Sequence, residues 1–207
     1  MVDLRWDDTS GRFRDGSGRY ISERSVRAVV DQVADQASAR LAASAQAMLD
    51  GTKSLATFQA EAMATIKQAH VATAVIAHGG AEQMTFSRYG SVGNEIKSQY
   101  QYMRGMAEDI ASGRQPLNRT IVSRAAMYGQ ASRITYEKTR NAGQRQRGYA
   151  WERNVIHSGE TCSGCRAQSA RGLVPIGSLV PVGSRTCLSR CRCTLSYART
   201  NEAAQAA

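Results

Sequence analysis

The residues of this chain that are best suited to chemistry are five cysteines near its C-terminal end. The first two form a Cys-x-x-Cys pair, Cys162 and Cys165, and the last two form a Cys-x-Cys pair, Cys191 and Cys193. A Cys-x-x-Cys pair on a turn directs two thiolates at one point, and a second cluster about twenty residues later can complete a tetrahedral zinc site with Zn–S bonds of roughly 2.3 Å. If the last pair lies on a strand, the two-residue period places both sulfurs on one face. The spacing therefore predicts a zinc site, with Cys187 as an alternative ligand or a buried thiol.

The state of these cysteines has three possible interpretations. An odd number of cysteines in a chain without an export signal disfavours a fully paired disulfide framework. Disulfides formed late, in an exposed particle, and unlinked thiols remain alternatives to zinc. Three or four thiolates leave no open coordination position, so the expected zinc is structural, and its binding would supply folding free energy to a small core.

Basic residues are concentrated in the same half of the chain. Residues 114–207 hold 15 Lys and Arg against 4 Asp and Glu, whereas residues 1–113 are close to neutral. This half favours a polyanion or an acidic protein surface as its partner, although a basic face can also serve solubility alone. The candidate contacts to nucleic acid or to an acidic partner are Arg119, Arg124, Arg133, Lys138, Arg140, Arg145 and Arg147.

The elements that position these residues are expected to be mostly helices. Apolar residues recur every three or four positions in four segments, which predicts amphipathic helices. Residues 148–197 lose this period and indicate short strands and turns. The predicted fold class is mainly α, with long amphipathic helices and a small C-terminal α+β cysteine-rich region. The four helices are expected at 22–48, 55–78, from about 94 to 113, and from 118 to about 140.

The first helix is preceded by a short polar segment with two aromatic residues. Gly11–Ile21 has two short arms around an Asp-Gly-Ser-Gly turn, which predicts a hairpin. Because this segment is too short to bury Phe13 and Tyr20 by itself, we expect both rings to dock on another subunit. The alternative is that the arm folds back and the rings cover the first helix near Val26 and Val29.

These patterns divide the chain into five parts. The two first helices, joined by a short break, should pack antiparallel, either within one chain or as part of an oligomeric bundle. The expected parts are an arm at 1–21, a helical domain at 22–113, a basic helix and linker at 114–147, a cysteine-rich module at 148–197 and a tail at 198–207.

Several classes of protein are disfavoured. No apolar run approaches the roughly 18 residues of a membrane-spanning helix, and the first ten residues are polar, so we expect a soluble chain that is not exported. Phosphate loops, nucleophile elbows, zinc-protease motifs and dinucleotide fingerprints are absent from the sequence. We therefore expect that the protein is not an enzyme.

Five motifs follow one another in the C-terminal half of the chain. They are the Arg-rich helix Arg133–Arg140, Gly148–Trp151, the Cys162/Cys165 pair, Gly172–Pro175 and Cys191-Arg192-Cys193-Thr194-Leu195. Together these motifs resemble the Mu F-like head morphogenesis domain of tailed bacteriophages, and the resemblance covers about residues 118–197. One departure concerns the position three residues before the first Cys of Cys-Arg-Cys, where the family usually has His and this chain has Leu188. The family's His ligand therefore does not carry over, and Cys187 is the neighbouring candidate.

The resemblance implies a minor head protein, or minor capsid protein, of the virion. Such a structural protein would be associated with the portal or the inner capsid and would act in head assembly, genome packaging or release. Its implied partners are the portal protein, the major capsid protein and phage DNA bound without sequence preference, with assembly in the host cytoplasm and no membrane partner. The alternative is a zinc-containing, sequence-nonspecific nucleic-acid-binding protein. A nuclease is disfavoured because few carboxylates follow residue 113.

Overall fold

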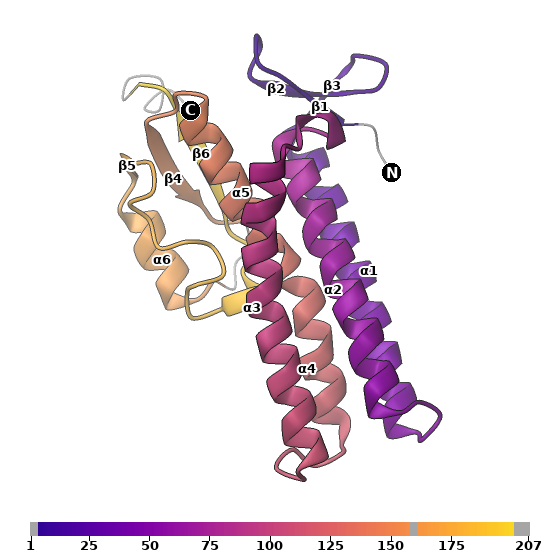
Figure 1. Cartoon of the computed structure of the whole chain (residues 1–207). Helices are drawn as coiled ribbons and strands as arrows, with labels where there is room; N and C mark the ends of the chain where they lie inside the picture. Colours follow the sequence, from indigo (N-terminus) through magenta and orange to yellow (C-terminus); the bar gives the residue numbers. More distant parts are fainter. Residues whose placement is uncertain (1–3, 158–160, 201–207) are drawn as a thin grey trace.

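The fold is a long helical bundle with a small sheet at one end and a cysteine-rich module along one side (Figure 1). A computed structural model describes residues 4–157 and 161–200. The fold class is as predicted, mainly α with a small C-terminal α+β region. The helices of the bundle are α1 (Glu23–Leu49), α2 (Leu55–His78), α3 (Phe86–Ala111), α4 (Arg119–Gln130) and α5 (Ser132–Gln146).

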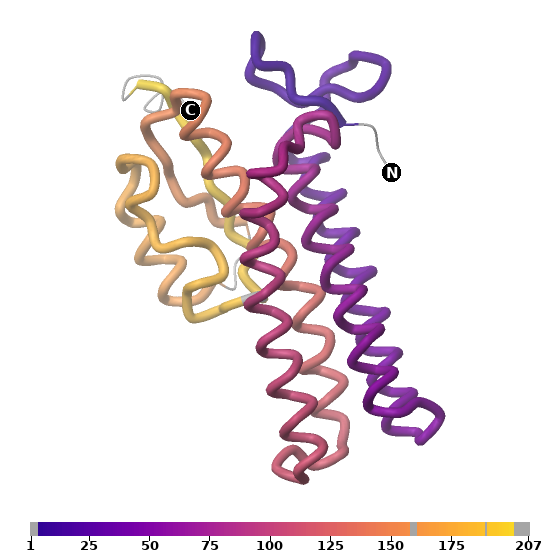
Figure 2. Tube along the Cα trace, in the orientation of Figure 1, coloured from indigo at the N-terminus to yellow at the C-terminus, as the bar shows by residue number. Residues whose placement is uncertain are grey.

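The first two helices confirm the prediction from the apolar period. Ser22 and Ser54 cap their N-termini, and each side-chain oxygen accepts a backbone N–H three residues later at 3.1 Å. Such a cap satisfies one of the donors that a helix start leaves free. The α1–α2 turn and the α3–α4 turn both lie at the end of the bundle away from the small sheet (Figure 2), so α1 and α2 are antiparallel.

The third and fourth predicted helices have different bounds. Helix α3 begins at Phe86, about eight residues earlier than predicted, and contains Gly90 and Gly93 on its exposed side. A glycine costs a helix roughly 1 kcal/mol, which the packing of buried neighbours such as Val92 offsets. The helix predicted from 118 to about 140 is broken at Ala131 into α4 and α5, and α5 continues to Gln146.

Helix α4 packs in the same core as the first three helices, across the boundary predicted at 113. A central cluster joins Leu41 of α1, Phe58 of α2, Met103 of α3 and Ile121 of α4. Helices α1 and α4 approach so closely at Gly129 that any Cβ there would overlap the backbone of Ser38. The predicted basic helix is therefore a structural member of the bundle.

The small sheet at the end of the bundle confirms and extends the predicted hairpin. Strand β2 (Arg12–Asp15) pairs antiparallel with β3 (Tyr20–Ile21), and an additional strand, β1 (Leu4–Asp7), pairs with the other edge of β2. The sheet rests on the C-terminal end of α2, where the Trp6 N–H donates to the Gly79 carbonyl at 3.1 Å. Gly79 has φ +88°, and a Cβ there would overlap Trp6. Glycine is therefore required for this close approach.

The two aromatic residues of the hairpin have different environments. Phe13 is only 2% exposed and lies in a cluster with Trp6, Val26 and Val30. The expectation that Phe13 docks on another subunit is therefore wrong, because β1 and α1 bury it within the chain. Tyr20 is 48% exposed, and its docking on a partner stays a prediction.

The C-terminal module is a three-stranded antiparallel sheet with one helix. The strand order is β5-β4-β6, with register pairs such as Glu152↔Val174 and Asn154↔Leu195. The short strands were predicted, but the helix α6 was not, because Ser163–Ala170 is too short to show an apolar period. Its elements are β4 (Trp151–Val155), α6 (Ser163–Ala170), β5 (Leu173–Pro175) and β6 (Thr194–Ala198), and the short 3-10 turns of the chain are η1 (Ala81–Gln83) and η2 (Leu188–Arg190).

Among the described residues, no helix combines the length and the apolar character needed to cross a membrane. Of the predicted tail, Ala198 is the last residue of β6, and 201–207 lie outside the described residues.

Candidate metal centre

All five cysteines lie in one buried cluster of the C-terminal module. Their sulfur atoms form two triads, each with all sulfurs within 4.8 Å of one another, and Cys165 belongs to both. The first triad adds Cys162 and Cys187, and the second adds Cys191 and Cys193. None of the five is in a disulfide. Cys187 is therefore inside the cluster and not set apart from it.

The Cys-x-x-Cys pair is positioned by a helix start, where a turn was expected. Cys162 is the N-cap of α6, and its Sγ accepts the backbone N–H of Cys165 at 3.3 Å. The N-terminus of a helix favours negative charge, and an N–H donor does the same for a thiolate. This local structure therefore directs both sulfurs to one point.

The other three cysteines come from the segment that leads into β6: Cys187 directly precedes η2, and Cys191 and Cys193 follow it. Cys191 and Cys193 directly precede the first residue of β6, so the condition that they lie on the strand is not met, but both are buried, at 5% and 7% exposure. The sulfur of Cys165 lies 3.5 Å from that of Cys191 and 3.6 Å from that of Cys187. The loop thus folds back so that its sulfurs meet the start of α6.

Two sulfur–sulfur distances in the cluster match the spacing of ligands around a tetrahedral metal ion. With Zn–S bonds of about 2.3 Å, sulfur ligands are separated by about 3.8 Å, close to the observed distances. Burial and the neighbouring thiols raise the pKa of Cys187, and they raise that of Cys193 to about 12. A bound cation reverses this preference, because it attracts thiolates. The cluster could therefore hold a metal ion.

A buried arginine that the sequence did not single out lies against the cluster. Arg185 is 5% exposed, and its Nη1 lies 3.6 Å from the sulfur of Cys165 and 2.6 Å from Oδ1 of Asn154. Its Nε donates to the Val180 carbonyl at 2.9 Å. A donor of this kind orients a sulfur ligand and stabilises its charge. Its place in the loop, two residues before Cys187, is the only sequence signal that could have indicated this role.

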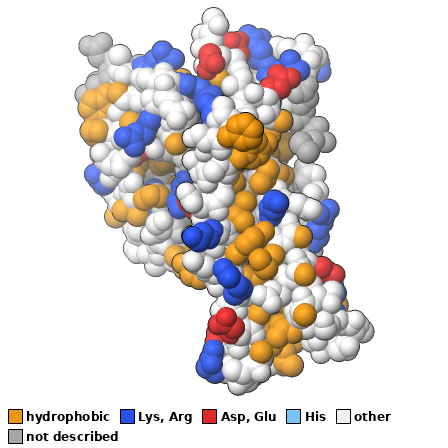
Figure 3. All heavy atoms as spheres, viewed as in Figure 1, with side chains coloured by type: hydrophobic (Ala, Val, Ile, Leu, Met, Phe, Trp, Pro, Cys, Tyr) orange, Lys and Arg blue, Asp and Glu red, His pale blue; other side chains and the backbone are white. Residues whose placement is uncertain are grey.

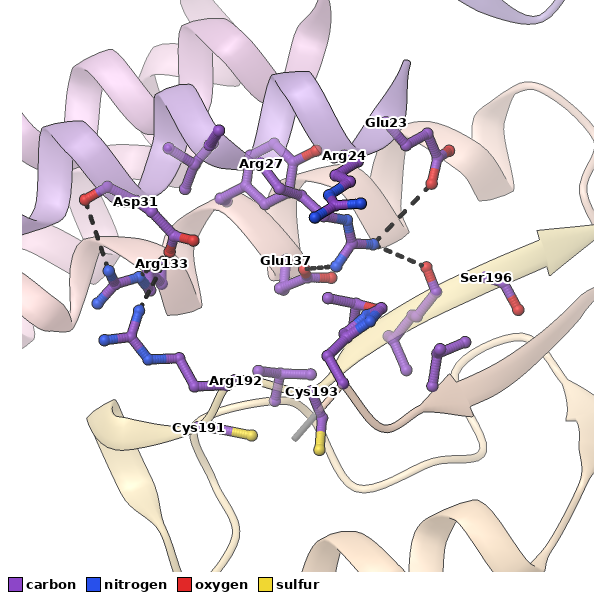
Figure 4. Close-up of a pocket in the computed structure, with 18 residues that line it drawn as sticks. Glu23, Arg24, Arg27, Asp31, Arg133, Glu137, Cys191, Arg192, Cys193 and Ser196 are labelled. Carbon is purple, nitrogen blue, oxygen red and sulfur yellow. Dashed lines mark hydrogen bonds and ion pairs between the residues drawn. The ribbon is translucent and has the colours of Figure 1, made fainter. Parts of the chain in front are cut away.

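The module is attached to the bundle by ion pairs between residues far apart in the sequence (Figure 4). Arg133 of α5 pairs with Asp31 and, at 2.9 Å, with Asp35. Arg192, between the two cysteines of the last pair, reaches the same Asp31 at 3.3 Å. One carboxylate of α1 therefore connects α5 to the loop that carries Cys191 and Cys193.

Side chains of α5 form hydrogen bonds with the backbone at the outer edge of β6. The carbonyl of Leu195 accepts from Nη1 of Arg140 at 3.0 Å, and its N–H donates to the carboxylate of Glu137. Arg27 of α1 lies 3.6 Å from Glu137, and Arg140 also pairs with Glu23. Burial raises the pKa of Glu137, although the two arginines oppose this shift. Helix side chains thus replace the neighbouring strand that an edge strand lacks.

Most of the basic residues that were predicted to contact nucleic acid or an acidic partner are engaged in interactions within the chain. Arg133 and Arg140 are buried and ion-paired, so in this conformation neither is available to a phosphate or to an acidic partner. Lys138 pairs with Glu95, Arg147 with Asp8, and Arg124 hydrogen-bonds Gln115. Arg119 and Arg145 remain exposed. On the face drawn in Figure 3, Lys and Arg are scattered among apolar and neutral side chains and form no continuous patch.

His157 lies outside both sulfur triads. Its Nε2 is 2.6 Å from the hydroxyl of Thr194, and burial together with Arg27 lowers its pKa. It therefore acts as a hydrogen-bonding residue of the module.

Comparisons of the chain with protein-family models, with curated proteins and with solved structures found no match. The fold and the cluster thus define a helical protein with a cysteine-rich module that could hold a metal ion.

Proposed function

We propose that this chain is a minor head protein of a tailed bacteriophage whose cysteine-rich module is held together by structural zinc. The observation that carries the proposal is the convergence of all five sulfurs behind an Arg-rich helix, in the order of the head morphogenesis motif. A set of four cysteine ligands supports a structural metal, since four protein ligands leave the ion no open coordination position for water or substrate. Bound zinc would supply positive charge and a cross-link to a module with a small apolar core.

The proposed ligands are Cys162, Cys165, Cys187 and Cys191. The sulfur of Cys187 interacts with those of the other three, whereas the hydrogen-bonding neighbours of the Cys193 sulfur are Cys165 and Asn154. In this assignment Cys187 replaces the His that the resembling family has nearby, and Cys193 is a buried neighbour. This set differs from the one that spacing alone favours.

We propose that the chain binds another protein of the head, either the portal protein or the major capsid protein. Arg140 bonds β6, and Arg133 shares Asp31 with Arg192 of the module, which supports a role for the basic helix in holding the module; Arg147 is engaged with Asp8 of the arm. DNA contacts would then rest on the fewer exposed residues, such as Arg119 and Arg145, and would be salt-sensitive.

The metal assignment is tested by zinc analysis of protein made under reducing, zinc-replete conditions. We expect about one zinc per chain, lost in the Cys165→Ser and Cys187→Ser variants and retained in Cys193→Ser. The helical circular dichroism signal should remain in all three variants, because the bundle core does not include the cluster. Wild-type protein without zinc would contradict the metal proposal, and loss of zinc in Cys193→Ser with retention in Cys187→Ser would restore the set favoured by spacing.

The location is tested by mass spectrometry of purified phage particles. We expect peptides of this chain at a constant ratio to the major capsid protein. Its presence in infected or lysogenic cells but not in particles would refute the proposed role in the virion.

A further inference from the structure

A cavity lies between the small sheet, the start of α1, the end of α5 and strand β6. We call it the arm cavity. Its volume is about 630 Å³, and its walls include Trp6, Phe13, Tyr20, Gln144, Tyr149 and Tyr197. This volume is in the range of sites that hold a small molecule, roughly 300–1,000 Å³. The arm cavity does not include the cysteines.

The aromatic rings of the arm cavity are covered by arginines. A guanidinium lies 4.6 Å above the centroid of Trp6, 4.6 Å above that of Tyr20, and 5.1 Å above those of Tyr149 and Tyr197. All the cation–π contacts found among the described residues involve rings of this cavity. The stacking arginines are Arg12 and Arg14 on Tyr20, Arg147 on Trp6, Arg199 on Tyr149 and Arg140 on Tyr197. Stacked guanidinium and aromatic planes form a surface suited to a planar, electron-rich group.

Three polar atoms of residues that line the cavity are buried and have no hydrogen-bond partner within the described part of the chain. They are Nε1 of Trp6, Nε of Arg140 and Oε1 of Gln144, on residues that are 8%, 2% and 3% exposed. Buried polar atoms are nearly always partnered, and leaving one unpaired is costly. The two nitrogen atoms are donors and the Gln144 oxygen is an acceptor. A ligand that satisfied all three would need two acceptors and one donor along its edge.

We propose that the arm cavity binds a nucleotide. Its base would stack among the aromatic rings and exchange hydrogen bonds with Trp6 and Gln144. Its phosphate would meet Arg12 and Arg199, which form no ion pair with a described carboxylate. A proline-rich peptide would also use aromatic rings and the indole N–H, but it offers few donors to Gln144 and requires no cations. This inference does not depend on the proposed function, and the nucleotide can be free or can end a nucleic-acid strand.

The sharpest variant is Gln144→Met, which removes the unpartnered acceptor and keeps an unbranched side chain. We expect nucleotide binding to weaken about tenfold, while the free protein keeps or gains stability because a buried unsatisfied oxygen is lost. If Gln144 had only a structural role, Gln144→Met would instead lower the stability of the free protein. The matched control is Gln146→Met, two residues further along α5 and exposed, which should change neither property.

Binding is measured by the fluorescence of Trp6 in a Trp151→Phe background, which leaves one tryptophan. The probes are deoxyadenosine monophosphate, a 5′-phosphorylated single-stranded oligodeoxyadenylate, inorganic phosphate and a proline-rich peptide. Saturable quenching by the mononucleotide supports the proposal with a free nucleotide as ligand, and quenching by the oligonucleotide alone supports it with a strand end. Equal competition by inorganic phosphate, binding of the peptide alone, or no binding at millimolar nucleotide would overturn it, as would unchanged affinity in Gln144→Met.

Discussion

Replacing Arg140 by Met should destabilise the protein strongly, although the sequence presents this residue as one of several surface cations. Arg140 is 2% exposed and connects three elements: it donates to the Leu195 carbonyl of β6, pairs with Glu23 at the start of α1 and stacks on Tyr197. Met fills a similar volume but replaces none of these interactions. The variant therefore isolates the loss of the buried guanidinium.

The size of the effect follows from the surroundings of each interaction. A hydrogen bond from a charged donor to a buried carbonyl contributes about 1.5–3 kcal/mol, and a desolvated cation–π contact about 2 kcal/mol. The pair with Glu23 adds little, because that side chain is 53% exposed. Removing a buried charge recovers part of its desolvation cost, so we expect a net loss of about 3 kcal/mol. For a domain of this size that corresponds to a fall in Tm of roughly 6–12 °C.

Urea unfolding followed by circular dichroism measures this loss, with Arg119→Met as the control. Arg119 is exposed in the first turn of α4, and its replacement should change the free energy of unfolding by less than about 0.5 kcal/mol. A loss below about 1 kcal/mol for Arg140→Met, or an equal loss for both variants, would refute the assignment of Arg140 as the residue that joins β6 to the bundle.

Three further predictions concern the bundle and the arm. Gly129→Ala should destabilise the protein by at least about 2 kcal/mol, because the new Cβ overlaps α1, whereas Gly93→Ala on the open face of α3 should stabilise it by up to about 1 kcal/mol; thermal unfolding of both variants tests this pair. Burial lowers the pKa of His70 from 6.5 to about 4, so the unfolded chain binds a proton first. Stability should therefore be complete above about pH 6.5 and fall by about 3 kcal/mol as the pH drops to about 4, and His70→Gln should reduce that loss in urea titrations at several pH values. Phe13→Ala should cost the isolated protein about 3 kcal/mol, whereas Tyr20→Ala should leave its stability nearly unchanged and lower its incorporation into particles; normal incorporation of Tyr20→Ala would contradict docking through this ring.

The differences between prediction and structure have identifiable physical causes. The third helix was predicted to begin only at about residue 94, but the buried side of α3 packs on α2 and stabilises the helix through Gly90 and Gly93. Phe13 was assigned to a partner because the hairpin alone cannot bury it. Trp6 of β1 and Val26 and Val30 of α1 cover it, and the sequence did not predict strand β1.

The cysteine cluster also shows the difference between what spacing along the chain indicates and where the residues lie in space. The sequence indicated five cysteines capable of meeting, and they do meet. Spacing could not place Cys187 in contact with Cys165, nor indicate that Arg185 would lie against the sulfurs, because the loop between α6 and β6 has no periodic pattern. The curvature of that loop is set by packing of residues such as Leu179 and Val182 in the module core.

The sequence by itself determined the properties that depend on neighbours in the chain: the amphipathic period of α1 and α2, their serine caps, the hairpin turn and the clustering of cysteines. Only the tertiary structure decided the role of the basic residues. Arg133 meets Asp31 across 102 positions, and Arg140 meets Glu23 across 117. The net charge of a segment does not show such pairing, because a cation pairs with the acidic side chain that is nearest in space, which can be far away in the sequence. The same packing placed the arginines over the rings of the arm cavity, which no local pattern indicates.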